Sequence, residues 1–383
     1  MTGVQTCALP ISKLFATLFS DIASGDENYN RVYVIGLIVA AVVILVYTFM
    51  GGFKAVCTTD LIQGLMMIVA ILTVPVLAYA ILTFDTSFSS ALAAKGVEQP
   101  AQFLNFFVNG DGTPVSAVSI ISNLAWGLGY FGMPHILVRF MAVKSNEEIK
   151  KSRKIAVVWV IISLTASCLI GLIARGYLTA QLDDATSESV FIRTIQQLFS
   201  GNGVLIFIGG IFLCGILAAI MSTADSQLLV TASAVSEDLY KGAVKKNASE
   251  KSSLLVGKIA VAVVAVIAFF IALNPKSSIM GLVSDAWAGF GSAFGPVVLL
   301  ALFWKRSTLS GAISGMATGA LTVIIWDYIP LVNGQTLYAA TNLYSLVVGF
   351  GLALIVNVIV SLLSKKPSKE IIDEFDSIKN IEV

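Results

Sequence analysis

The sequence predicts an all-α polytopic membrane protein, and three observations support this fold class. Of the 383 residues, 57% are hydrophobic and only 12% are charged, and the mean hydropathy is +0.88. Such values lie far outside the range of a soluble domain with a single core. Nine apolar runs are each long enough to cross a bilayer core of roughly 30 Å as a helix of about 20 residues. None of these runs has the alternating pattern of an outer-membrane barrel strand, and helices satisfy their own backbone hydrogen bonds, so we predict a helical bundle.

The nine runs follow one another along most of the chain. They lie near residues 32–50, 61–83, 115–134, 155–177, 204–234, 254–273, 279–304, 309–328 and 342–363. Glycines concentrate in the third, fifth and seventh runs, where they permit close helix packing or local unwinding. We therefore expect a transmembrane domain over residues 13–364 and a polar cytoplasmic tail over residues 365–383.

Basic side chains gather in every second loop. The loop after the third run contains Arg139, Lys144, Lys150, Lys151, Arg153 and Lys154, the loop after the fifth contains Lys241, Lys245, Lys246 and Lys251, the loop after the seventh contains Lys305 and Arg306, and the tail contains Lys365, Lys366, Lys369 and Lys379. The alternate loops carry only Lys95, Arg193 and Lys276 between them. Because cytoplasmic loops hold the excess of Lys and Arg, we predict that the chain begins outside and ends in the cytoplasm.

The composition and motifs argue against several other classes of protein. A formal net charge of +1 without a clustered basic face argues against a nucleic-acid partner. The cysteines in the apolar runs show no CxxC spacing and suggest neither a disulfide framework nor a zinc site. With one histidine and no HExxH motif, the sequence also argues against an intramembrane hydrolase, so we do not expect an enzyme.

The fifth run contains a polar cluster in the segment MSTADSQ. On a helix, Ser222, Asp225 and Ser226 share one face, and Thr223 lies along an adjacent edge. Their oxygens, together with a backbone carbonyl such as that of Ala219, suit a hard cation such as sodium, for which another helix must supply the remaining ligands. Alternatively, the hydroxyls bond back to the carbonyl four residues earlier and only soften the helix.

Three carboxylates are relevant to these alternatives. A carboxylate near the bilayer centre costs roughly 2.5–3.5 kcal/mol, which favours a function for Asp225, unless it lies at the cytoplasmic end where water reaches it. Asp60, in the segment CTTDLIQG, is either the N-cap of the second run or a cation ligand or gate. Asp285 lies near the outer end of the seventh run, where solvent exposure explains it equally well.

The third run ends in the segment WGLGYFGMPH. Trp126 and Tyr130 lie four residues apart and therefore on one helical face, and Pro134 frees a backbone carbonyl one turn back. Such a face can bound a small, partly apolar solute. Aromatic pairs in membrane helices also serve as core packing or as an interfacial belt, so both interpretations stay open.

Three separated motifs resemble a known family. They are WGLGYFGMPHILVRFMA, LAAIMSTADSQLLVTASAVSEDLYK and GLVSDAWAGFGSAFGPVVLL. They occur in the same order in the solute:sodium symporter family, and the chain resembles the proline carriers of that family from about residue 14 to the tail. The resemblance implies secondary active uptake of L-proline across the cytoplasmic (inner) membrane, with Na⁺ as the co-transported ion and membrane lipid around the helices. The alternatives are symport of another small organic solute (pantothenate, a sugar, a monocarboxylate or sialic acid) and, from a different class, a membrane sensor module.

The resemblance also implies the arrangement of the helices. Thirteen spans in this family contain two inverted five-helix repeats, and the nine runs match the last nine of these spans. The chain is then expected to hold the last two helices of the first repeat, the complete second repeat and two further helices.

The N-terminus departs from the family. Residues 1–12, MTGVQTCALPIS, resemble the translation of a sequencing adapter, so we expect the coding sequence to enter near Lys13 and four spans to be missing. Because the missing part includes the broken helix that supplies other sodium ligands in this family, we expect that the chain as written does not transport.

The resemblance implies site residues for the ion. Ser222 and Thr223 are expected to provide hydroxyl ligands of the main sodium site, together with the backbone carbonyl of Ala219. Asp60 matches a family carboxylate that is linked to sodium coupling and lies near Ser226.

For the solute, the resemblance implies a pocket shaped by Trp126, Tyr130 and Pro134. Met133 stands where proline carriers often have Gln, which leaves fine substrate selectivity open. Asp225 occupies a position at which the residue type varies, so the resemblance assigns it only as a gate or coupling residue.

Overall fold

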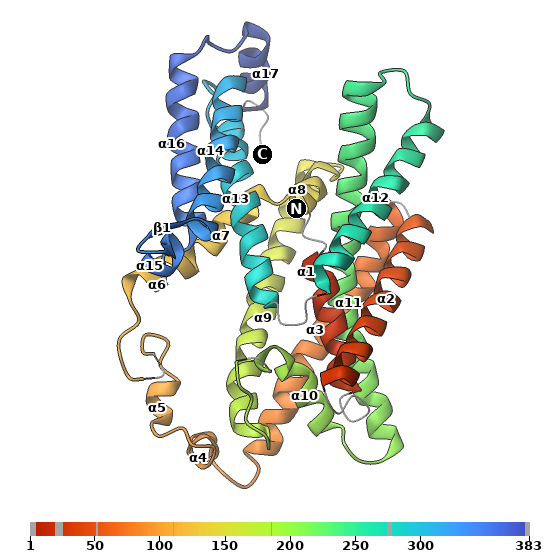
Figure 1. Cartoon of the computed structure of the whole chain (residues 1–383), viewed down its shortest axis with the longest axis vertical. Helices are drawn as coiled ribbons and strands as arrows, with labels where there is room; N and C mark the ends of the chain where they lie inside the picture. Colours follow the sequence, from red (N-terminus) through yellow and green to blue (C-terminus); the bar gives the residue numbers. More distant parts are fainter. Residues whose placement is uncertain are drawn as a thin grey trace. The chain divides into compact units, whose positions relative to one another are not determined.

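The computed structural model describes residues 5–19, 26–50, 53–109, 111–184, 186–273 and 278–379 (Figure 1). Its elements in chain order are α1 (Gln5–Leu18), α2 (Asp26–Met50), α3 (Phe53–Leu82), α4 (Phe88–Ala94), α5 (Pro100–Phe103), α6 (Ala117–Leu124), α7 (Trp126–Gly129), η1 (Tyr130–Gly132), α8 (Pro134–Met141), α9 (Asn146–Tyr177), η2 (Ser187–Ser189), α10 (Val190–Leu198), α11 (Gly203–Ser233), η3 (Ala234–Val244), α12 (Glu250–Ala272), α13 (Ile279–Phe303), α14 (Leu309–Tyr328), β1 (Pro330–Val332), β2 (Gln335–Thr336), α15 (Leu337–Thr341), α16 (Ser345–Leu363) and α17 (Lys369–Lys379). Of these, η1 and η2 are short 3₁₀-helices and η3 is a π-helix that continues α11.

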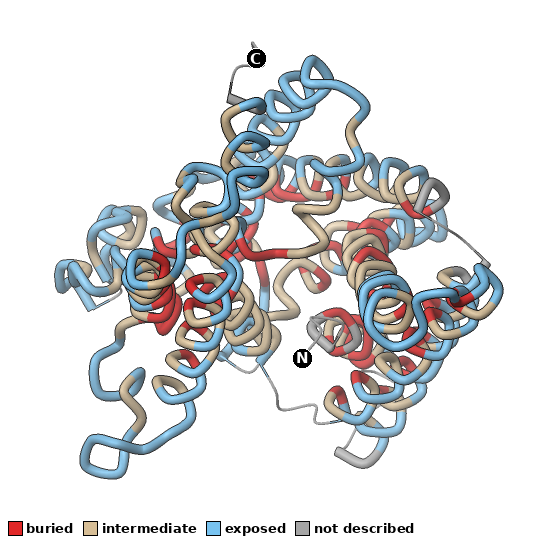
Figure 2. The backbone as a smooth tube through the Cα atoms, turned by 90° about the horizontal axis from the view of Figure 1, so that it is seen from above, coloured by how far each residue is buried: buried red, intermediate tan, exposed pale blue. Residues whose placement is uncertain are grey.

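Eight of the described helical segments are long and apolar enough to cross a membrane. They are Asn28–Val46, Val56–Leu82, Asn146–Tyr177, Gly203–Val244, Glu250–Ala272, Ile279–Phe303, Leu309–Tyr328 and Ser345–Leu363. Large apolar side chains on these helices are exposed, for example Leu61, Val76 and Ile161, with exposed fractions of 65%, 64% and 61%. In Figure 2, which colours the backbone by burial, exposed and buried residues alternate along many of the helices. The predicted all-α polytopic membrane protein is therefore confirmed.

The third predicted run, 115–134, is not one continuous helix, so the described residues hold eight long apolar helices where the sequence has nine apolar runs. The segment consists of α6, α7 and η1, after which the backbone of Met133 is extended (φ −84°, ψ 110°) and α8 begins at Pro134. Proline has no N–H to continue the preceding helix, and its ring disfavours a helical conformation of the residue before it. Three glycines in the preceding six residues weaken the helix further.

Two compact units can be distinguished by their internal contacts. Unit 1 contains residues 1–106 and 153–282, and unit 2 contains residues 107–152 and 283–383. In unit 1, α3 packs against α11, and α1 packs against α2. Gly215 of α11 lies where an added Cβ would come within 2.9 Å of the Cβ of Ala70 on α3, so the missing side chain lets these two helices approach closely.

Part of the proposed adapter segment belongs to α1. Residues 1–4 lie outside the described residues, whereas residues 5–12 form the first part of the helix, in which Cys7, Leu9 and Ile11 are buried. The assignment of residues 1–12 stays a prediction.

Glu188, just before α10, fixes the start of α13 within unit 1. Its carboxylate accepts hydrogen bonds from Lys13 Nζ at 2.5 Å, from the Ile279 backbone N–H at 2.7 Å and from Ser278 Oγ at 3.2 Å. Burial raises the pKa of Glu188, but the hydrogen bonds from Lys13 and Ile279 outweigh it and lower the pKa below its usual value of 4.5.

In unit 2, α14 packs tightly along α16. Gly311 and Gly315, four residues apart on α14, lie where an added Cβ would come within 2.0 Å of Ser361 Oγ and 2.9 Å of Asn357 Cβ, respectively. This is the small-residue spacing by which membrane helices approach one another. The chain after α14 turns back through the β1–β2 hairpin, whose Asn333 and Gly334 have φ values of 49° and 76°, as the Asn-Gly dipeptide favours.

Candidate functional site

Three oxygens come together near the middle of α11. Ser222 Oγ donates to the backbone carbonyl of Ala219 at 3.0 Å, and Thr223 Oγ1 donates to the same carbonyl at 3.2 Å. We call Ala219, Ser222 and Thr223 the hydroxyl cluster. Such side-chain to backbone hydrogen bonds are common for Ser and Thr in helices and need no bound ion. They also bring together three oxygens of the kind that a hard cation prefers.

Ser226 lies one turn further along α11 and faces two carboxylates. Its Oγ is 2.8 Å from the Ser222 carbonyl, 3.3 Å from Asp60 Oδ2 and 3.5 Å from Asp225 Oδ1. Asp225 and Ser226 are buried, with exposed fractions of 0% and 5%. A hydroxyl has one hydrogen and can donate it to only one of these three oxygens at a time. We call Asp60, Asp225 and Ser226 the carboxylate site.

The structure excludes one alternative for each of the two carboxylates. Asp60 is not the N-cap of its helix, because α3 begins at Phe53 and Asp60 lies two turns inside it. Asp225 does not lie at a water-exposed helix end, because α11 and η3 continue as far as Val244 and the side chain is buried. The close packing of α3 on α11 brings Asp60 to Ser226 across 166 residues of sequence.

Two of the three predicted solute residues, Trp126 and Tyr130, belong to an aromatic cluster in unit 2. Trp126 stacks on Trp287 of α13, with ring centroids 6.0 Å apart, and on Tyr344, at 5.6 Å. Tyr130 meets the same Trp287 edge-on at 4.9 Å. The indole N–H of Trp287 donates to the backbone carbonyl of Trp126 at 2.9 Å. Trp126, Tyr130, Trp287 and Tyr344 form what we call the aromatic cluster.

Glycines set the backbone of this segment against α13. An added Cβ at Gly132 would lie 2.3 Å from the Phe290 carbonyl oxygen, and one at Gly129 would lie 2.0 Å from Trp287 Nε1. Pro134 occupies the first position of α8, and Met133, its cap residue, makes no side-chain capping hydrogen bond. The N-terminus of α8 therefore keeps its partial positive charge without a capping side chain.

Trp287 and Tyr344 were not singled out from the sequence. Trp287 stands in the motif GLVSDAWAGFG, where its large ring among small residues was the available signal. Tyr344 immediately precedes α16 and has no local pattern that marks it. Asp285, in the same motif, accepts a hydrogen bond from the Tyr328 hydroxyl at 2.6 Å, so its position has a structural explanation.

Comparison with known proteins identifies the family of the chain. Residues 13–319 match the sodium:solute symporter family. Over 368 residues the chain is 41% identical to the osmoregulated proline transporter OpuE of Bacillus subtilis (strain 168), covering 94% of this chain and 70% of that protein. Over 382 residues it is 39% identical to a sodium/proline symporter of Staphylococcus aureus, covering 96% of this chain and 71% of that protein.

A solved structure is similar in fold. It is the substrate-bound outward-open state of a Na⁺-coupled sialic acid symporter, with a TM-score of 0.69 and 18% sequence identity, and the match covers 96% of this chain and 73% of that one. At this level of identity the likeness concerns the fold alone.

Proposed function

Because the chain belongs to the sodium:solute symporter family, we propose that it takes up L-proline together with sodium across the cytoplasmic membrane. Relatives named as a proline transporter and as a sodium/proline symporter, both about 40% identical, support proline as the solute. The co-transported ion is Na⁺. The family and these relatives are transporters, so the function is movement of a solute rather than a chemical reaction on it.

The meeting of α3 and α11 at Ser226 is the observation that carries the proposal. Two carboxylate oxygens and a backbone carbonyl lie within 3.5 Å of one hydroxyl oxygen in a buried site. Carboxylates held together away from water repel one another, and a bound cation relieves this repulsion. Sodium among these oxygens, with further ligands from the hydroxyl cluster one turn earlier, matches the chemistry of the site.

The coupling energy is sufficient for concentrative uptake. One charge that crosses a potential of 100 mV releases about 2.3 kcal/mol, and each tenfold sodium gradient adds about 1.4 kcal/mol. A single sodium ion per cycle therefore sustains a solute gradient of roughly 10² to 10³.

The aromatic cluster is the proposed solute site. The rings of Trp126 and Tyr130 offer apolar surface for the pyrrolidine ring of proline, and Trp287 holds the backbone of this segment in place. The N-terminus of α8 at Pro134 offers partial positive charge to the proline carboxylate. Met133 is buried beside it, where proline carriers often have Gln, and its sulfur offers no hydrogen-bond donor to the solute.

The membrane orientation follows from the loop charges. The protein is a multi-pass membrane protein, and we propose that the broken segment 117–141 also crosses the bilayer, which makes nine crossings with the eight long helices. With the basic loops in the cytoplasm, the C-terminus is then cytoplasmic and the first residues lie outside.

The test is uptake of radiolabelled proline by cells that lack their own proline carriers. The chain is expressed as it stands, for which the sequence analysis expects no transport, and also preceded by the N-terminal helices of OpuE, for which we expect uptake. Uptake by both is measured with and without sodium. Thr223→Ala is expected to raise the half-saturating sodium concentration about 10-fold or more, because a hydrogen-bonding ligand to a charged group contributes about 1.5–3 kcal/mol. Thr223→Ser retains the hydroxyl and is expected to restore sodium affinity.

Thr231→Ala is the matched control. Thr231 lies on the same helix and makes the same type of backbone hydrogen bond, to the Gln227 carbonyl at 2.8 Å, two turns beyond the hydroxyl cluster. Equal effects of Thr223→Ala and Thr231→Ala would reject the ion site. Sodium-dependent uptake of pantothenate, a sugar, a monocarboxylate or sialic acid, in place of proline, would support symport but exclude proline as the solute.

A further inference from the structure

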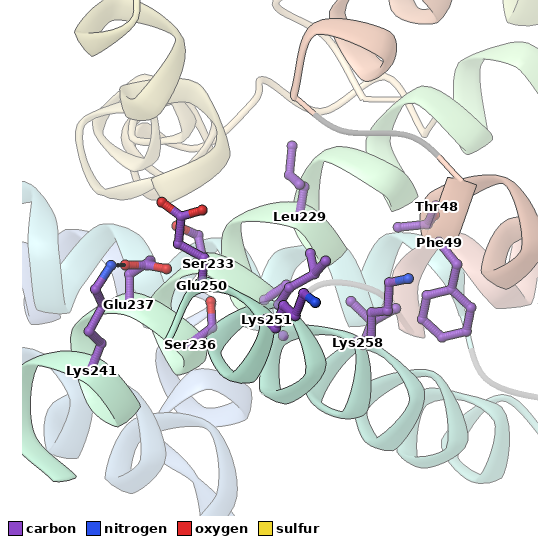
Figure 3. A pocket seen from close by; sticks show the side chains of 14 residues that line it. Thr48, Phe49, Leu229, Ser233, Ser236, Glu237, Lys241, Glu250, Lys251 and Lys258 are labelled. Atoms are coloured by element: carbon purple, nitrogen blue, oxygen red, sulfur yellow. Dashed lines mark hydrogen bonds and ion pairs between the residues drawn. The ribbon is translucent and has the colours of Figure 1, made fainter. Parts of the chain in front are cut away.

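A pocket of about 660 Å³ opens where the end of α2, the end of α11 with η3, and the start of α12 meet (Figure 3). All of its lining residues belong to unit 1. It lies beside the loop that contains Lys245 and Lys246, on the side that the charge pattern assigns to the cytoplasm. None of its lining residues belongs to the proposed sodium or proline sites.

The pocket is amphipathic. Leu229, Val261 and Leu254 contribute apolar side chains, and Phe49 lies at one side. The hydroxyl oxygen of Thr48 is buried and has no hydrogen-bond partner among the described residues. A buried hydroxyl without a partner is uncommon in native proteins, so this atom points to a group that the protein itself does not supply.

Three lysines and two glutamates line the pocket, and two of the lysines lie on α12. Lys251 and Lys258 are seven residues apart, which places them on one face of the helix about 10 Å apart along its axis. Neither lysine forms an ion pair with a residue in the described part of the chain, whereas Lys241 on the same pocket is paired with Glu237 at 3.1 Å. In Figure 3, Lys258 lies on the side of Thr48 and Phe49, and Glu250 lies on the side of Lys241 and Glu237.

Lys258 is unusual because it lies inside a membrane-spanning helix. It is the ninth residue of α12, about 12 Å along the helix from its start. A charged side chain at this depth is costly unless it reaches the headgroup region or finds a partner of opposite charge.

We propose that this pocket binds an anionic phospholipid of the cytoplasmic leaflet. The phosphate of the headgroup lies between the ammonium groups of Lys251 and Lys258, the Thr48 hydroxyl donates to a headgroup oxygen, and an acyl chain follows Phe49, Leu254 and Val261. Anionic lipids are concentrated in this leaflet, and clustered lysines at its surface attract them. The apolar side of the pocket favours a lipid over a free phosphate, because an inorganic anion gains nothing from contact with hydrocarbon side chains.

The proposal is tested by lipid binding to the purified 383-residue chain. The chain in mild detergent is titrated with short-chain phosphatidylglycerol, and bound lipid is counted by native mass spectrometry. The double variant Lys251→Gln/Lys258→Gln is expected to weaken binding about 30-fold, because each lysine near a membrane surface contributes about 1 kcal/mol to the attraction of anionic lipid. Lys251→Arg/Lys258→Arg keeps both charges and is expected to retain binding.

A matched control removes the same charge from the neighbouring loop. Lys245→Gln/Lys246→Gln lowers the net charge equally but alters no lining residue, so it is expected to leave binding within about 3-fold of the unaltered chain. An equal loss in the two Gln pairs would overturn the proposal in favour of unspecific attraction. Equal binding of phosphatidylcholine would overturn the role of the lysines, and displacement of the lipid by millimolar inorganic phosphate would assign the site to a free anion instead.

Discussion

Replacing Gly132 by alanine tests how closely the broken segment must approach α13. Gly132 ends η1, one residue before the extended Met133, and an added Cβ would lie 2.3 Å from the Phe290 carbonyl oxygen and 2.8 Å from Gly291 Cα. Both contacts are with backbone atoms, which cannot move aside as the end of a flexible side chain can. The two segments must therefore separate.

The size of the effect follows from this geometry. Real Cβ atoms do not come within 3.0 Å of such atoms, so the backbones at Gly132 and Phe290 must move apart by at least about 0.7 Å. Forcing an extra carbon into a packed interior costs about 1–3 kcal/mol. The shift also moves the Trp126 and Tyr130 rings relative to Trp287, so we expect a higher KM for proline as well as a lower melting temperature.

Gly127→Ala is the matched control, since it makes the same change five residues earlier in the same segment. Apart from its own helical turn, the described part of the chain has no atom within 4 Å of an added Cβ at Gly127, and alanine favours a helix over glycine by up to about 1 kcal/mol. Thermal unfolding of both purified variants and proline uptake by both are measured. Gly127→Ala is expected to melt at or above the temperature of the unaltered chain, and Gly132→Ala several degrees below it. Indistinguishable melting temperatures for the two variants would refute the close approach.

Three further changes separate the roles of individual side chains. Trp287→Phe removes the indole donor to the Trp126 carbonyl and is expected to raise the KM for proline about 2- to 10-fold, the value of one hydrogen bond, at unchanged sodium affinity. Trp326→Phe, which removes an equivalent indole-to-carbonyl bond to Leu343, is its control, and an equal rise in KM would contradict a local role. Asp60→Asn keeps the shape but removes the charge, so we expect the half-saturating sodium concentration to rise about 10-fold or more, and an unchanged sodium dependence would exclude Asp60 from the ion site. For Glu188, the pKa is lower in the folded state than in the unfolded state, so the stabilisation by its charge is present above pH 4.5 and is lost as the pH falls through the folded pKa. Glu188→Gln is expected to reduce the fall in melting temperature at acid pH, and the free energy involved is less than about 1 kcal/mol because the site is partly solvated. A pH dependence of the melting temperature identical to that of the unaltered chain would show that the charge has no effect.

The sequence predicted best those features that depend on neighbouring residues. Hydropathy over about 20 residues identifies a membrane helix because a helix satisfies its hydrogen bonds within itself, and eight of the nine runs are continuous helices. The hydroxyl cluster was predictable for the same reason. Ala219, Ser222 and Thr223 lie within one helical turn, so their mutual geometry follows from the backbone of α11 alone.

The sequence was less reliable where a helix begins or breaks. Asp60 directly precedes the second apolar run, 61–83, so the sequence allowed it to be the N-cap of that helix, whereas the structure shows that α3 begins at Phe53. The third run is apolar throughout, yet its glycines and Pro134 divide it into short helices. Hydropathy reports how apolar the side chains of a segment are, and it does not report where glycine or proline interrupts the helical backbone.

Local sequence alone was enough to predict a helical membrane protein, to place the oxygens of Ala219, Ser222 and Thr223 on one turn of α11, and, through three motifs, to identify the family that the chain resembles. The resemblance implied that Asp60 lies near Ser226, and the packing of α3 on α11 gives the contact itself, at 3.3 Å across 166 residues. The hydrogen bond from Trp287 to Trp126, across 161 residues, was not foreseen and comes from the packing of the helices. These contacts depend on which helix faces pack together, and that choice is made by side chains on both helices at once, as at Gly215 against Ala70. Local periodicity fixes the face that a residue occupies on its own helix, whereas packing determines what that face meets.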